Sequence, residues 1–140
     1  MRKSIASVSM ALLLLAVLLA CRSDKPEDRV RKAFGGCVAA VEAGDAGAAA
    51  APLDPAFRGP EGMDKAAARL FLAGLLRREK VGITVLRNEV TVQGGEAFQE
   101  VDLLLTGGGG LLPQDASRRA FGLRWRKTGG DWRITEIQER

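Results

Sequence analysis

The sequence predicts an α+β fold in which N-terminal helices cover one face of a four-stranded antiparallel sheet. Apolar residues recur at helical spacing up to about residue 80, and from Gly82 onward they alternate with polar residues. Glycine pairs at 94–95 and 129–130 separate the alternating segments, as expected for tight turns. A run of helices followed by a run of strands is typical of an α+β domain.

The first 20 residues have the pattern of a secretory signal peptide. Arg2 and Lys3 are followed by an apolar run over 10–19, which is shorter than the roughly 20 residues of a spanning helix. The run closes on Leu18-Leu19-Ala20-Cys21, which resembles the lipobox of bacterial lipoproteins. Cleavage is therefore expected between Ala20 and Cys21, and the alternative is an ordinary signal peptide in which this cysteine is incidental.

The lipobox resemblance implies an address and an anchor. A lipoprotein would carry a diacylglycerol on the Cys21 thiol and an acyl chain, such as palmitate, on its amine, and two or more chains give stable anchoring. Residues 21–25 would form the lipidated tether. Arg22 stands where an Asp favours inner-membrane retention in enterobacterial lipoproteins. We therefore expect the cell envelope, at the periplasmic face of the outer membrane.

Three helices are predicted next. The first begins near Pro26 and ends near Gly44, with Val30, Phe34 and Val41 on its apolar stripe. A short alanine-rich helix over 45–51 follows, with Asp45 as its cap. Residues 52–62 hold three prolines and are predicted to be a loop that buries Phe57.

The third helix is predicted to start after its cap, Asp64, and to end near residue 80. Its buried face is predicted from the helical spacing of its apolar residues and small residues. These are Ala67, Leu70, Phe71, Gly74 and Leu75.

Four strands complete the predicted fold. In the first, over 83–92, the apolar residues are odd-numbered up to Val85 and even-numbered from Val90. This switch indicates a bulge near 87–89. The second buries the odd-numbered apolar residues of 97–105, and the third, over 121–126, buries Phe121 and Trp125 with Leu123. The last carries Trp132 and Ile134, and the opposite parity of Ile137 indicates another bulge.

Length and composition limit the function. The 120 residues left after position 20 suit one domain, over 26–140. The leader holds two of the 21 basic residues and none of the 17 acidic ones, so the remaining net charge is only +2. This weak charge indicates no nucleic-acid partner. The chain has no histidine, which excludes Ser-His and Cys-His catalysis and imidazole metal ligands, and we expect no metal site or cofactor.

Cys37 is the second cysteine and would be unpaired once Cys21 is acylated. Such a thiol either reacts, pairs with another chain, or packs as a small hydrophobic residue. Its helical spacing from Phe34 and Val41 favours packing.

Most of the chain, over about 26–138, resembles the nuclear transport factor two-like superfamily, whose members are also called cystatin-like cones. Arg29 to Asp45 is similar to the opening helix of that family, and Gly130 to Ile134 is similar to its closing strand. The resemblance implies a strongly curved sheet wrapped around its helices, often with a pocket at the open end. The tyrosine of its isomerase branch and the histidine of its cyclase branch have no counterpart here, because the chain contains neither residue type.

Two pairs of residues are candidates for function, and no catalytic residue is assigned. Glu100 and Asp102 share one strand face and are weak candidates for an acid and base pair, although a solvated face paired across the sheet with Arg124, Arg126 or Arg133 is favoured. Leu111 and Leu112 follow four glycines and are candidates for a pocket rim or a partner contact, with burial in the core as the alternative.

The sequence supports three hypotheses. The first is a non-catalytic, outer-membrane-anchored module that binds a small apolar ligand or an envelope protein. The second is a carboxylate-based, isomerase- or hydrolase-like enzyme of the same fold. The third is a structural accessory of the envelope that self-associates through its sheet.

Overall fold

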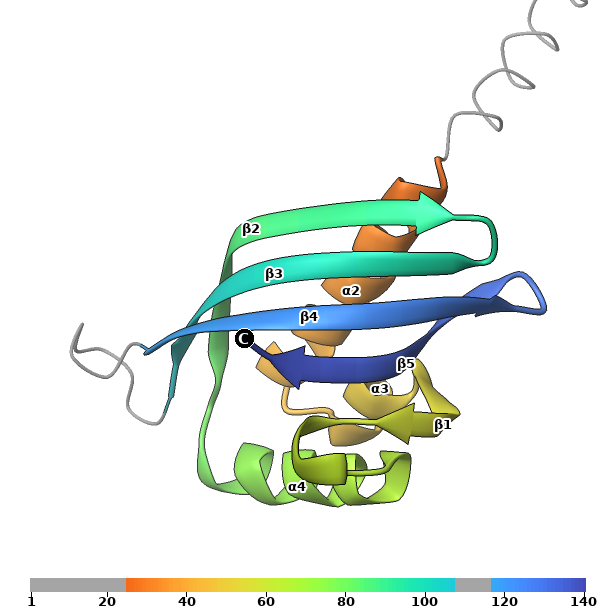
Figure 1. Cartoon of the computed structure of the whole chain (residues 1–140). Coiled ribbons are helices and arrows are strands. Elements are labelled where there is room, and N and C mark those ends of the chain that lie inside the picture. The colour runs from red at the N-terminus through yellow and green to blue at the C-terminus, as the bar shows by residue number, and fades with distance from the viewer. Residues whose placement is uncertain (1–24, 108–116) are drawn as a thin grey trace, which may run out of the picture.

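The computed structural model describes residues 25–107 and 117–140. Three α-helices precede most of the sheet (Figure 1). The first lies against its concave side, and the other two pack on each other beside the edge strand. In chain order the elements are α2 (Pro26–Glu42), α3 (Ala46–Ala50), β1 (Leu53–Arg58), a 3-10 turn η1 (Pro60–Gly62), α4 (Lys65–Arg78), β2 (Gly82–Gln93), β3 (Glu96–Thr106), β4 (Ser117–Thr128) and β5 (Asp131–Glu139). No helix among the described residues is long and apolar enough to cross a membrane.

The sheet has five strands in the order β1-β5-β4-β3-β2, so the prediction of four strands was wrong by one. Four of them are antiparallel neighbours, and β1 pairs in parallel with β5. Strand β1 lies in the segment predicted as a loop. Proline is tolerated on an edge strand because one side of that strand needs no hydrogen bonds, and Pro55 sits on this edge. Phe57 is buried as predicted, with 2% of its surface exposed.

The helix boundaries follow local chemistry. Helix α2 ends in a glycine cap: Gly44 has φ +75°, and the amides of Gly44 and Asp45 donate to the carbonyls of Val41 and Ala40. The Asp45 side chain then caps α3 by accepting from the amide of Ala48 at 3.0 Å. The side chain of Asp64 caps α4 in the same way, through the amide of Ala67 at 2.8 Å.

The predicted buried face of α4 was wrong at three of its five residues, whereas Gly74 and Leu75 are half-buried. Ala67, Leu70 and Phe71 are exposed, whereas Ala68 is buried and Leu72 packs against the core. The segment 66–76 is almost entirely apolar, so its periodicity does not select one face. The helix instead lies at the open end of the curved sheet, where apolar side chains border a cavity.

The predicted alternation of inward and outward residues is found in the strands except at Val85, which is 40% exposed, and both bulges exist. In β2 the register shifts at Leu86, close to the predicted position. In β5 the register shifts at Thr135, which brings Ile137 to the core side. Both bulges add twist and curvature to the sheet.

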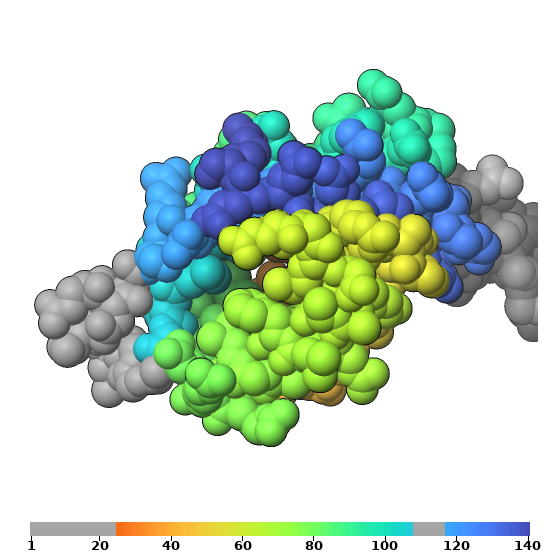
Figure 2. Space-filling model, turned by 60° about the horizontal axis from the view of Figure 1, so that its bottom comes forward, coloured from red at the N-terminus to blue at the C-terminus, as the bar shows by residue number. Residues whose placement is uncertain are grey.

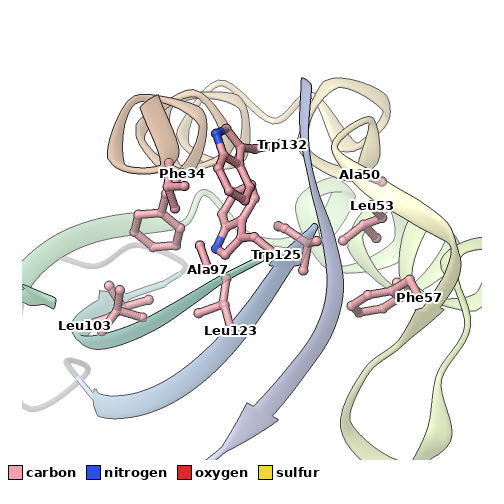
Figure 3. Packing of buried hydrophobic residues seen from close by; sticks show 13 residues of the cluster. Phe34, Ala50, Leu53, Phe57, Ala97, Leu103, Leu123, Trp125 and Trp132 are labelled. Carbon is pink, nitrogen blue, oxygen red and sulfur yellow. The ribbon is translucent and has the colours of Figure 1, made fainter. Parts of the chain in front are cut away.

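The core lies between the concave face of the sheet and helices α2 and α4 (Figure 3). Trp125 is fully buried at its centre, beside Trp132 and Phe34. One polar side chain, Gln99, is buried with them at 1% exposure. Its Oε1 accepts from Trp125 Nε1 at 2.9 Å, and its Nε2 donates to Asn88 Oδ1 at 2.8 Å.

Candidate functional site

A cavity of about 590 Å³ opens between helix α4 and the end of the curved sheet. Figure 2 shows a hollow between the yellow-green atoms near β1 and the green atoms of α4, with the darker atoms of α2 visible inside it. Its volume lies within the range of roughly 300–1,000 Å³ that small-molecule sites occupy. The sheet contributes Leu53, Phe57, Leu105, Arg119, Phe121, Leu123, Ile134, Ile137 and Glu139; the helices and loops contribute Phe34, Cys37, Val41, Ala49, Pro60, Glu61, Met63, Ala68, Phe71, Leu72 and Leu75.

The curvature of the sheet and the position of α4 create this cavity. Strands β4 and β5 bend over one side of it, while α4 crosses the open end and contacts α3 and β1. Because α4 does not pack flat on the sheet, Phe71 remains 58% exposed at the edge of the cavity. Exposed apolar side chains beside an open apolar cavity are typical of the entrance to a binding site.

Charged groups in the lining are few. They are Glu61, Arg119 and Glu139, and Arg119 Nη1 lies 2.6 Å from Glu139 Oε1. Each side chain of that ion pair is about half exposed, so the pair lies at the solvent side of the cavity. Glu61 has a left-handed backbone, with φ +60°, which is uncommon for a residue with a Cβ. The cavity therefore combines an apolar interior with a narrow polar edge.

Cys37 lies in this lining and packs against the core, in agreement with the interpretation that it behaves as a small hydrophobic residue. Burial raises the pKa of its thiol to about 11, which keeps it protonated at neutral pH. A protonated thiol is a poor nucleophile and a poor metal ligand. In this cavity Cys37 therefore contributes apolar surface.

We expect the Cys37 thiol to react slowly with a disulfide reagent at pH 8 in the folded fragment Arg22–Arg140, which contains every described element and a single cysteine. Unfolding in guanidinium should restore a fast reaction. Between pH 9 and 11 the thiol ionises in the unfolded chain and stays protonated in the folded one, so stability should fall as pH rises through this window. A Cys37→Ala variant should lack this component of the fall. Equal reaction rates in the folded and unfolded chain would contradict the burial of the thiol.

The carboxylate pair is located away from the cavity. Glu100 lies 3.1 Å from an Arg87 nitrogen and 3.0 Å from one of Arg140, and Asp102 lies 3.2 Å from Arg118. Both carboxylates are on the convex side of β3, opposite to the buried Val101 and Leu103. They pair with arginines, though with different ones from the expected Arg124, Arg126 or Arg133.

Leu111 and Leu112 lie outside the described residues, as do Ala20 and Cys21. Leu105 and Arg119, which stand on either side of the undescribed segment 108–116 in the sequence, both line the cavity. A role for the two leucines at its rim therefore stays a prediction. Among residues 25–107 and 117–140, no group of three acidic or cysteine side chains lies close enough together to hold a metal ion.

Sequence reasoning missed two features of this region. It did not identify the cavity-lining residues, because their apolar character is equally consistent with a closed core. It also overlooked Gln99, although the alternation that places Ala97 and Val101 inside places Gln99 there too. A polar residue at a position that the alternation places inside the core is a recognisable signal of an internal hydrogen bond.

Known structures share this architecture, although the sequence matches no family model and no curated protein. An NTF2-like protein of unknown function from Pseudomonas putida KT2440 superposes with a TM-score of 0.72 at 14% identity, covering 81% of this chain and 84% of that one. An NTF2-like protein from Cytophaga hutchinsonii superposes with a TM-score of 0.68 at 12% identity, covering 83% of this chain and 98% of that one. An NTF2-like protein with a cystatin-like fold from Novosphingobium aromaticivorans superposes with a TM-score of 0.65 at 16% identity, covering 89% of this chain and 86% of that one. These likenesses show the fold alone.

Proposed function

We propose that this chain, with the nuclear transport factor two-like cone fold, is a lipid-anchored periplasmic protein that binds a small apolar ligand in the cavity beneath α4 without catalysing a reaction. The observation that carries the proposal is the 590 Å³ cavity, whose lining is apolar except at its edge. Binding sites for small molecules are mostly apolar and contain a few polar groups that fix the orientation of the ligand.

The chemistry of the lining favours a ligand with an apolar body and one polar end. Phe34, Leu123 and Ile134 line the cavity and are buried, and such side chains bind hydrocarbon by removing its surface from water. The Arg119–Glu139 pair at the edge offers both a donor and an acceptor to a polar end that remains near solvent. We infer a ligand such as a fatty acid, an isoprenoid or a small aromatic compound.

The same lining argues against catalysis. Its titratable groups are the protonated Cys37 thiol, Glu61, and an arginine and a glutamate that are already paired with each other. General acid–base catalysis needs a group that exchanges protons near the working pH and lies within hydrogen-bond reach of the substrate. The other carboxylate candidates, Glu100 and Asp102, form ion pairs on the convex side of the sheet.

Binding can be tested with the fragment Arg22–Arg140 and N-phenyl-1-naphthylamine, a neutral apolar dye whose fluorescence rises in a dry environment. The proposal predicts saturable binding of one dye per chain, reversed by a medium-chain fatty acid. A linear, unsaturable rise would count against a defined cavity site.

The anchor is proposed from the lipobox at Leu18-Leu19-Ala20-Cys21, and the outer membrane from Arg22 after the cysteine. We expect the full-length chain, expressed in a Gram-negative host, to incorporate radioactive palmitate and to enter the detergent phase on partitioning. Cys21→Ser should abolish both properties, because it removes the thiol that receives the diacylglycerol. Cys37→Ser is the matched control and should retain both. If the wild-type protein incorporates no palmitate, the anchor is refuted and the cavity proposal is unaffected.

A further inference from the structure

A second hollow, of about 850 Å³, lies beside the N-terminal half of α2, and its described lining residues are all different from those of the apolar cavity. Four parts of the fold form it: α2, the α3–β1 junction, the start of α4 and the first residues of β5. Its lining consists of Arg29, Lys32, Ala33, Ala51, Pro52, Lys65, Gly130, Asp131, Trp132 and Arg133. We call it the basic hollow.

Positive charge exceeds negative charge in the basic hollow. Arg29 and Lys32 are one turn apart on α2, so they project from the same side of the helix. Lys65 extends from the start of α4, and Arg133 lies on β5, whereas Asp131 is the one acid among the described lining residues. In the described part of the chain Arg29, Lys32 and Arg133 join no ion pair. Lys65 Nζ donates to the carbonyl oxygens of Leu53 at 2.7 Å and Ala51 at 3.5 Å. Cations gathered around one concave surface attract an anion.

Trp132, which lines the basic hollow, also carries a buried donor without an acceptor. Trp132 is 93% buried, and within the described residues its Nε1 is the one buried side-chain nitrogen or oxygen that has no hydrogen-bond partner. Figure 3 shows this indole nitrogen on the side of the ring toward α2, away from the nitrogen of Trp125. Buried donors are nearly always paired in folded proteins, so an unpaired one beside a basic surface indicates a missing acceptor.

We propose that the basic hollow binds a phosphate group. Arg29 and Lys32 line it from α2, Lys65 from α4, and Trp132, which carries the unpaired Nε1 donor, from β5. Donors from three separate elements suit a tetrahedral group with several oxygens and up to two charges better than a flat carboxylate with two oxygens. Arginine and lysine are the usual partners of phosphate oxygens.

The phosphate group could be supplied by a soluble compound or by a phospholipid headgroup. Helix α2 begins five residues after Cys21, and five extended residues span at most about 18 Å. With Cys21 acylated, the first turn of α2 and Arg29 would stay within reach of the headgroups. The headgroup source rests on the proposed anchor, whereas the phosphate site itself does not.

The test uses the two tryptophans of the chain, which give two indole N–H signals in a ¹⁵N correlation spectrum of the Arg22–Arg140 fragment. Inorganic phosphate, added at constant ionic strength, should shift the Trp132 signal and leave that of Trp125, which is bonded to Gln99, in place. Trp132→Phe assigns the signals. Arg29→Gln should weaken the apparent affinity at least fivefold. The matched control is Arg31→Gln, which removes the same charge from the same helix. Arg31 pairs with Asp28 and is not among the lining residues of the hollow, so this variant should change the affinity less than twofold.

A second arm separates the two sources. Vesicles of phosphatidylcholine with about one third phosphatidylglycerol should co-sediment with the fragment in an Arg29-dependent manner if headgroups are the source, and pure phosphatidylcholine vesicles should not. A Trp132 shift with inorganic phosphate alone would indicate a soluble phosphate compound. The absence of a Trp132 shift with inorganic phosphate together with no Arg29-dependent co-sedimentation, or equal losses in Arg29→Gln and Arg31→Gln, would overturn the proposal. The dye-binding test of the apolar cavity is independent of each of these outcomes.

Discussion

Replacing Gln99 by leucine is expected to destabilise the fold by about 1–3 kcal/mol, although the new side chain is apolar and similar in size. Gln99 Oε1 is the acceptor for Trp125 Nε1, and neither residue is more than 1% exposed. Without the amide, the indole N–H would stay buried and unpaired. Asn88 also loses its partner, but it is half-buried and water can replace the lost bond. Chemical denaturation of the fragment, followed by circular dichroism, measures the change.

The double variant Gln99→Leu with Trp125→Phe separates this cause from simple misfit. Removing both partners leaves no unpaired donor, so the double variant should be more stable than the sum of the two single changes predicts. Gln93→Leu, at an exposed position on β2, is the control and should lie within about 0.5 kcal/mol of wild type. Strict additivity of the two core changes would contradict the assigned role of the Gln99–Trp125 bond.

Filling the apolar cavity is expected to weaken ligand binding more than tenfold. Leu72 projects from α4 into the cavity, so Leu72→Trp would place an indole in the space that the ligand needs. The cavity, of about 590 Å³, has room for the larger side chain, which should therefore be accommodated with little loss of stability. Dye titration measures the affinity, and thermal unfolding confirms that the variant is folded.

Leu70→Trp provides the matched control for this prediction. It makes the same substitution on the same helix, two residues away, at a side chain that is 73% exposed and does not line the cavity. Its affinity should stay within twofold of wild type. If both variants bind the dye equally well, the ligand does not occupy the space beneath α4.

Much of the fold could be predicted because its determinants are local. The caps at Asp45 and Asp64, the glycine stop at Gly44 and the strand parities all act within a few residues. Strand β1 was missed because its pairing with β5 joins Leu53 to Ile134, far apart in sequence, and Pro55 suggests a loop. Parallel pairing leaves no turn signature in the chain.

The site was harder to predict than the fold. Whether Phe71 and Leu72 fill a core or border a cavity depends on how far α4 stands from the curved sheet, which no local pattern encodes. The carboxylates at 100 and 102 were predictable, since their parity placed them outside the core. The unpaired Trp132 donor was not, because it depends on elements that meet only in three dimensions.

Native mass spectrometry of the Arg22–Arg140 fragment, purified from a periplasm, tests the central claim most directly. A bound apolar ligand predicts a reproducible extra mass that disappears on denaturation, is retained by Leu70→Trp and is absent from Leu72→Trp. A bare chain in all three samples, together with no saturable dye binding, would contradict the proposal that this cone carries a small apolar molecule.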